Sequence, residues 1–192
     1  MLNFDYQNPT RIIFGQGSTS KLSRSVPPKA RVLVLYGGGS VRRNGTLDDV
    51  LAALQQDGER HVAEFSGIEP NPTFETLMRA VQQVHEEQID FLLAVGGGSV
   101  IDGTKFVAAA ARLPASEDAW SILESRGRVI KDALPFGAVL TLPATGSEMN
   151  AGGVVTRAAT HDKISFSSRL LDTQFSILDP VRTYTLPARQ VA

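Results

Sequence analysis

The same short pattern occurs twice in the chain: an apolar run, three glycines and a serine, and then a sequence with helical periodicity. The run 31–36 leads into Gly37-Gly38-Gly39-Ser40, and the run 91–95 leads into Gly96-Gly97-Gly98-Ser99. Continuous runs of this kind are typical of strands buried on both faces, and alternation with helices indicates a parallel sheet. The pattern therefore predicts an α/β fold with a doubly wound, mainly parallel sheet, whose shared carboxyl edge carries both glycine turns.

The remaining elements fit this architecture. Helices are predicted after Thr46, which with Asp49 resembles a capping box, after Asn71 and Pro72 as far as residue 88, and from Ser99 to residue 111 with Ser99 as N-cap. Further strands are predicted at 61–65, 137–142, 154–156, 164–167 and 175–178, with a short helix at 120–123. Residues 186–192 predict the start of another helix, with Pro187 at its first position.

Composition excludes several classes of function. The 192 residues suit one globular domain, and the formal net charge of −1 does not favour nucleic acid or an anionic membrane as a partner. The chain has no cysteine, which excludes disulfides and thiol chemistry, and its three histidines are scattered at positions 61, 85 and 161. No apolar run approaches the ~20 residues of a transmembrane helix and no signal peptide is evident, so we expect a soluble cytoplasmic protein.

Glycines directly after a buried strand allow backbone N–H groups to approach a phosphate, and the N-terminus of the next helix adds about half a positive charge. The alternative is that the glycines only allow helix and strand to pack closely. Neither turn completes the G-x-G-x-x-G fingerprint, because Arg42 and Ile101 occupy the third glycine positions. Gly98 and Gly103 have the spacing of a P-loop, but the order of Thr104 and Lys105 is the reverse of the one required, which argues against a P-loop.

Other polar residues flank these turns. Asp102 either caps the helix from Ser99 or faces the ligand crevice, and residues 141–150 combine hydroxyls and an amide after a predicted strand. No carboxylate directly follows the 31–36 strand, where one would bind the ribose 2′-hydroxyl of NAD; Arg42 and Arg43 follow instead. A 2′-phosphate would be tolerated there, although two solvated arginines are the ordinary alternative.

Taken together, the motifs resemble the iron-containing (group III) alcohol dehydrogenases, and most closely their NADPH-dependent aldehyde reductase or butanol dehydrogenase branch. The matching stretches span the chain in order: 37–40 (GGGS), 67–72 (GIEPNP), 96–102 (GGGSVID), 142–148 (LPATGSE), 178–180 (LDP), 185–187 (TLP) and 189–190 (RQ).

The resemblance implies the dehydroquinate synthase-like fold, with a dinucleotide-binding domain over 1–186 and, at 187–192, the start of a helical metal-binding domain. The family's metal ligands, an Asp and a His four residues apart and two later histidines, would follow Ala192 and bind iron or zinc. Such an enzyme transfers hydride between NADPH and a short or medium aldehyde, is expected to be a homodimer, and uses its metal to polarise the substrate oxygen. We therefore expect the 192 residues alone to be inactive and to contain no catalytic or metal-ligating residue.

The resemblance also implies which residues contact NADP(H). The turn Gly96 to Ser99 would hold the pyrophosphate, Asp102 would lie on the nicotinamide side, and the turn Gly37 to Ser40 would receive the adenosine ribose and its 2′-phosphate. Further cofactor-contacting positions match Asn71, Thr141, Leu142, Thr145, Asn150 and Lys163.

Two alternatives stay open at this stage. One is a nucleotide-binding or assembly module without catalytic activity, and the other is a zinc enzyme of the related glycerol dehydrogenase or dehydroquinate synthase lineage. The apolar stretch Arg11 to Phe14 is a candidate for pairing with a neighbouring subunit.

Overall fold

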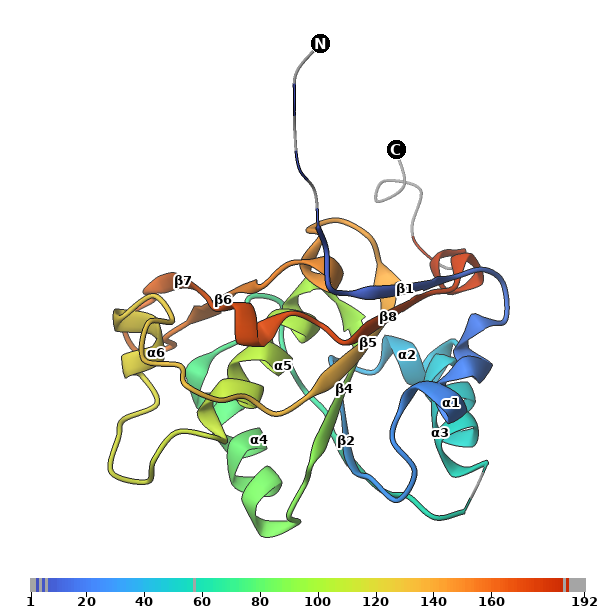
Figure 1. Cartoon of the computed structure of the whole chain (residues 1–192), viewed down its shortest axis with the longest axis horizontal. Coiled ribbons are helices and arrows are strands. Elements are labelled where there is room, and N and C mark those ends of the chain that lie inside the picture. Colours follow the sequence, from blue (N-terminus) through green and yellow to red (C-terminus); the bar gives the residue numbers. More distant parts are fainter. Residues whose placement is uncertain (1–2, 4, 6, 57, 185, 187–192) are drawn as a thin grey trace.

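A six-stranded parallel sheet forms the centre of the molecule in a computed structural model that describes residues 1–192 except 1–2, 4, 6, 57, 185 and 187–192 (Figure 1). The strand order is β1-β8-β5-β4-β2-β3, and every neighbouring pair is parallel. Its strands are β1 (Arg11–Phe14), β2 (Arg31–Tyr36), β3 (His61–Phe65), β4 (Phe91–Gly97), β5 (Phe136–Leu142) and β8 (Phe175–Leu178). The predicted α/β class is confirmed.

The predicted strands at 154–156 and 164–167 lie outside this sheet. They form a separate antiparallel hairpin of β6 (Gly152–Thr156) and β7 (Lys163–Ser167). The stretch Arg11–Phe14 is an edge strand of the main sheet, with β8 as its partner.

Helices cover both faces of the sheet. The helices are α1 (Leu22–Ser25), α2 (Ser40–Arg43), α3 (Thr46–Gln55), α4 (Phe74–Glu86), α5 (Gly98–Ala110) and α6 (Ser121–Glu124), with 3-10 turns η1 (Ser18–Lys21), η2 (Ser147–Met149), η3 (Arg169–Leu171) and η4 (Pro180–Thr183). In Figure 1, α4 and α5 lie on one side of the sheet and α1 and α3 on the other.

Each face has its own apolar core because successive strand side chains point in opposite directions. Leu33 and Leu35 of β2 join the cluster with α4 and α5, whereas Val32 and Val34 join the cluster with α3. This burial on both faces explains why β2 and β4 are continuous apolar runs.

The starts of three helices differ from the predictions. α3 follows Gly45, which has φ 74°, and Thr46 provides no cap. α4 is capped by Thr73, whose hydroxyl accepts a hydrogen bond from the Thr76 N–H, because Thr73 is extended as an N-cap must be, whereas Asn71 has φ 58°. α5 begins at Gly98, directly after β4, so Ser99 lies inside the first turn and is not the cap.

Apart from Leu186, the helix start predicted at 186–192 lies outside the described residues. None of the described helices is long and apolar enough to cross a bilayer.

Candidate cofactor site

Both glycine turns line one crevice of about 420 Å³ at the carboxyl edge of the sheet, as the repeated pattern predicts. The crevice lies where β2 and β4 end side by side. Its lining residues include Gly37, Gly38, Ser40, Gly96, Gly97, Gly98, Ser99, Thr141 and Leu142, all of which are predicted cofactor contacts.

The glycines of this crevice serve two different purposes. A Cβ at Gly96 would lie 2.6 Å from Cγ2 of Val100, and a Cβ at Gly98 would lie 2.3 Å from Oγ1 of Thr145, so these two positions are fixed by packing. A Cβ at Gly38 would have no atom within 4 Å and would project into open space. Packing therefore explains Gly96 and Gly98, whereas Gly38 leaves room for a ligand to approach the backbone closely.

A second pocket, of about 610 Å³, begins at Thr145, the residue that packs against Gly98. Asp102, Asn150 and the facing strands of the β6–β7 hairpin line it. Three more of the predicted cofactor contacts, Asp102, Thr145 and Asn150, thus meet in one place next to the glycine crevice.

Asp102 connects α5 to this hairpin and does not cap the helix. Its Oδ2 accepts a hydrogen bond of 3.0 Å from the Val154 N–H, and its buried Oδ1 makes no hydrogen bond in the part of the chain that the structure describes. Burial raises the pKa of the Asp102 carboxyl, against the opposing effects of the Ser147 hydroxyl and the Lys105 charge. A pocket-lining carboxyl with a spare acceptor oxygen is suited to receive a donor group of a ligand.

Lys105 is a central residue of the site that sequence reasoning treated only as a failed P-loop position. It is completely buried, and its Nζ lies 2.6–2.9 Å from four oxygens of residues 147–152. Burial lowers its pKa to about 8. A lone charged residue in the helical stretch 103–110 is the signal that could have identified it.

Two further predicted contacts pair with each other at the edge of the site. Lys163 Nζ donates a 2.7 Å hydrogen bond to Oδ1 of Asn71, and the Asn71 N–H donates to the Ser99 hydroxyl. Asn71, Lys163 and Gly39 are not among the residues that line the two pockets.

The first glycine turn has a carboxylate beside it that comes from a neighbouring strand. Glu64 of β3 accepts a hydrogen bond of 2.6 Å from Nη2 of Arg42, which also bonds the Tyr36 hydroxyl and stacks on its ring at 5.2 Å. Burial, together with the Glu64 carboxylate, raises the pKa of Tyr36. Arg42 is therefore charge-paired, whereas Arg43 makes no ion pair within the described residues and its Nη1 lies 3.6 Å from the position of a Cβ at Gly39.

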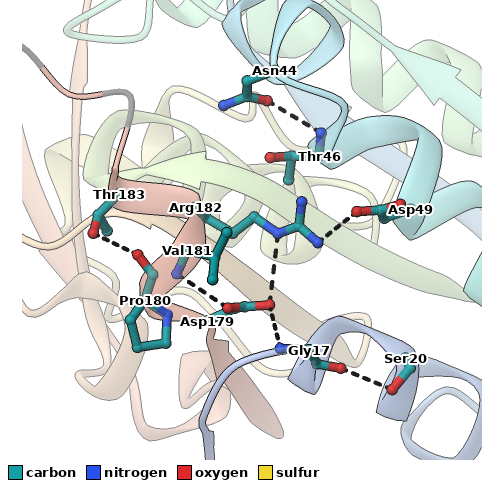
Figure 2. A network of polar contacts seen from close by, with 10 residues as sticks. All are labelled: Gly17, Ser20, Asn44, Thr46, Asp49, Asp179, Pro180, Val181, Arg182 and Thr183. Carbon is teal, nitrogen blue, oxygen red and sulfur yellow. Dashed lines mark hydrogen bonds and ion pairs between the residues drawn. The ribbon is translucent and has the colours of Figure 1, made fainter.

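The opposite wall of the crevice contains Arg182 of η4, the one charged side chain among the described residues that line it. Figure 2 shows its guanidinium between two carboxylates: Nη2 is 2.6 Å from Asp49 of α3, and Nε is 3.7 Å from the buried Asp179. Asp179 also accepts hydrogen bonds from the N–H groups of Gly17 and Val181. This network holds η4 against α3 and the start of η1.

Among the described residues, no group of three or more His, Cys, Asp and Glu could hold a metal ion. Nε2 of His61 lies 3.0 Å from Oε2 of Glu87, within hydrogen-bond distance, and no second histidine is near it in the sequence.

Comparisons with known proteins show which family the chain belongs to. The chain is 57% identical over 192 residues to the NADPH-dependent aldehyde reductase YqhD of Escherichia coli K12, and the aligned region covers 100% of this chain and 49% of the relative. It is 50% identical over 188 residues to the probable NADH-dependent butanol dehydrogenase 1 of Bacillus subtilis, covering 97% and 48%. The chain thus spans about half the length of the curated relatives it matches.

Solved structures give the same result. The crystal structure of E. coli K-12 YqhD superposes with a TM-score of 0.94 at 58% identity, over 98% of this chain and 48% of that one. The NADH-dependent butanol dehydrogenase A of Thermotoga maritima gives a TM-score of 0.89 at 41% identity, over 98% and 47%. Residues 9–180 match the sequence model of the iron-containing alcohol dehydrogenases, and the chain belongs to this family.

Proposed function

We propose that residues 1–186 form the NADP(H)-binding domain of an aldehyde reductase or alcohol dehydrogenase. The observation that carries this proposal is the crevice between the two glycine turns, in which Gly38 leaves its Cβ side open. Bound there, the cofactor would supply hydride to an aldehyde. The relatives named as aldehyde reductase and butanol dehydrogenases favour this reading over the glycerol dehydrogenase-like alternative.

The residues fit such a cofactor in order along the sheet edge. The backbone of Gly96 to Ser99 at the N-terminus of α5 would bind the pyrophosphate, because helix N-termini attract anions. Gly37 to Ser40 would bind the adenosine ribose, with Thr141 and Leu142 across the crevice. Asp102, Thr145 and Asn150 would contact the nicotinamide side, and the Asn71–Lys163 pair would close the edge.

Preference for NADP(H) over NAD(H) rests on the charges around the first turn. A free carboxylate near the ribose would accept the 2′-hydroxyl of NAD and repel a 2′-phosphate. Glu64 is the nearby carboxylate, and Arg42 already neutralises it. Arg43 adds a guanidinium without an acidic partner among the described residues, folded back on Gly39.

The activity of the whole protein is part of the proposal. We infer that iron or zinc binds to ligands that follow residue 192, that the substrate is a short or medium aldehyde, and that the 192 residues alone do not catalyse the reaction. We also infer a homodimer, since β1 has exposed Ile12 and Phe14, the latter 70% exposed, and its outer edge pairs with no other strand among the described residues.

The first test is intact mass together with fluorescence titration of the same sample with NADPH and NADH. A 20.6 kDa species that binds NADPH more tightly than NADH is the expected result. Equal affinities would refute the 2′-phosphate argument, and no binding of either nucleotide at the correct mass would refute cofactor binding by this chain.

A further inference from the structure

Lys105 has an unusual position for a lysine. Its side chain projects from α5 into the interior, where none of it is exposed. The ammonium donates to the carbonyl oxygens of Ser147, Asn150 and Gly152 at 2.6–2.8 Å and to Oδ1 of Asn150 at 2.9 Å. One side chain thus fixes both the backbone and a side chain of the segment from η2 to β6.

That segment forms one wall of the 610 Å³ pocket. Ser147, Asn150 and Gly152 all line the pocket, and Asp102, one turn before Lys105 on α5, lines it as well. Asn150 is doubly constrained, because its Oδ1 also accepts from the Gly152 N–H and its Nδ2 donates to the Gly146 carbonyl. The rotamer of Asn150 therefore depends on the group that bonds its Oδ1.

The protonation state of Lys105 decides how many of these contacts persist. An ammonium has three N–H donors, which serve four oxygen acceptors here. A neutral amine has two donors and a lone pair, so at least one of the three carbonyls would lose its donor and the lone pair would face an oxygen. Loss of the proton must loosen the wall.

The surroundings of Lys105 bring its pKa down to about 8. Burial lowers the pKa of Lys105 to about 8, although the carboxylates of Asp102, Asp172 and Glu148 oppose the shift. The strands β4, β5 and β6 that pack on α5 contribute no titratable side chain. Lys163 of β7 is the other cation near Asp102.

We propose that Lys105 is a positioning residue for cofactor binding, whose ammonium holds Asn150 and the 147–152 backbone in the ligand-competent arrangement. The inference rests on the proposed NADP(H) function. All three N–H bonds of Lys105 are directed at protein oxygens, so it acts through the pocket wall and not as a nucleophile or an acid toward the ligand.

The test follows nucleotide affinity and the wall itself as functions of pH. NADPH is titrated by fluorescence at intervals from pH 7 to pH 9.5 with the unaltered chain, with Lys105→Met, and with Lys131→Met as a matched control at an exposed lysine. For the unaltered chain and the control, the Kd is expected to rise about tenfold through an apparent pKa near 8. For Lys105→Met, the Kd at pH 7 is expected to be about tenfold higher than that of the unaltered chain and to stay constant as the pH rises.

A second measurement needs neither a variant nor a ligand. In the unaltered chain without nucleotide, NMR resonances of the Asn150 side-chain amide and the Gly152 N–H are expected to titrate with the same apparent pKa. Chemical shifts that do not change with pH, or a Kd for NADPH that is constant between pH 7 and pH 9.5, would overturn the inference even if Lys105→Met failed to fold. Titrating resonances with no binding of NADPH or NADH at any pH would refute the proposed function and leave the positioning of the wall by Lys105 standing.

Discussion

Replacing Gly38 by alanine is expected to affect ligand binding without disturbing the fold. A Cβ at this position meets no atom within 4 Å, and the backbone is outside the left-handed region. The unfolded chain loses conformational freedom on such a replacement, so the free energy of unfolding should stay constant or rise by up to about 1 kcal/mol. The added methyl group projects into the space that the cofactor is proposed to fill.

The effect on affinity follows from the size of that methyl group. It extends about 1.5 Å from Cα, so a ligand atom in contact with the Gly38 backbone must retreat by a similar distance. Losing one or two backbone hydrogen bonds to a charged ligand group, at about 1.5 kcal/mol each, corresponds to a Kd about 10- to 100-fold higher.

Gly98→Ala is the matched control, because there the Cβ would lie 2.3 Å from the Thr145 hydroxyl. Displacing Thr145 disturbs its 2.8 Å hydrogen bond to Ser147, and overpacking adds to the cost. We expect a loss of about 1–3 kcal/mol of stability together with weaker binding. Urea unfolding and NADPH titration of both variants provide the assay. If the Gly38→Ala chain binds NADPH as tightly as the unaltered chain, the cofactor does not approach the Gly38 backbone closely. If the replacement lowers the free energy of unfolding by more than about 1 kcal/mol, the space around the Cβ position is not free.

Four further predictions address the charges and caps described above. Arg42→Gln frees the Glu64 carboxylate, so the ratio of NADH to NADPH affinity should shift about tenfold toward NADH, and an unchanged ratio in paired titrations would contradict this role. Thr73→Ala removes the cap of α4 and should cost about 1 kcal/mol in urea unfolding, with no change in nucleotide affinity; a loss below about 0.3 kcal/mol would argue against the cap. Asp179→Asn weakens the charge-assisted bonds of a buried carboxylate and should lower stability by about 2 kcal/mol, which calorimetry would detect as a lower Tm. Since the pKa of Lys105 falls from 10.5 to about 8 on folding, the unfolded chain binds more protons between these pH values, so the free energy of unfolding should rise with pH by up to about 3 kcal/mol across that window, and Lys105→Met should abolish the rise.

The central sheet could be predicted because its signal is local. Strands buried on both faces must be apolar throughout, and β2 and β4 show this directly, as do the glycines that end them. The meeting of the two turns in one crevice follows from the parallel order alone. By contrast, β1 is short and has only one buried residue, Ile13, so its place beside β8 has no local signature.

The predictions of the helix starts were wrong for a different reason. Several residues within two or three neighbouring positions can act as the N-cap. Which of them does so depends on backbone angles that sequence patterns do not contain. Asn71, Thr73 and Ser99 all carry suitable side chains, yet only Thr73 has both the extended backbone and the hydrogen bond of an N-cap.

The sequence predicted that the two glycine turns would meet, but it did not predict the contacts of Lys105 or the Arg42–Glu64 ion pair. Lys105 contacts oxygens of residues that are 42 to 47 positions later in the chain, and Arg42 of α2 contacts Glu64 of β3. These contacts arise from the crossing of elements that are distant in the chain, so no spacing rule reveals them. The resemblance supplied Asp102 and Asn150, and the structure adds the lysine that lies behind them.

The pairing of β1 with β8 has a consequence for how the protein is made. Ile12 lies beside Ser176, and Asp179 accepts the hydrogen bond of Gly17 from 162 residues away. At roughly 5–20 residues per second, a ribosome needs on the order of 10 to 30 s between the synthesis of these partners. During that time the first strand has an exposed edge and no neighbour, while the β2–β4 region can already fold around its own helices. We therefore expect the nascent chain to become protease-resistant in two stages, with residues 11–14 protected last.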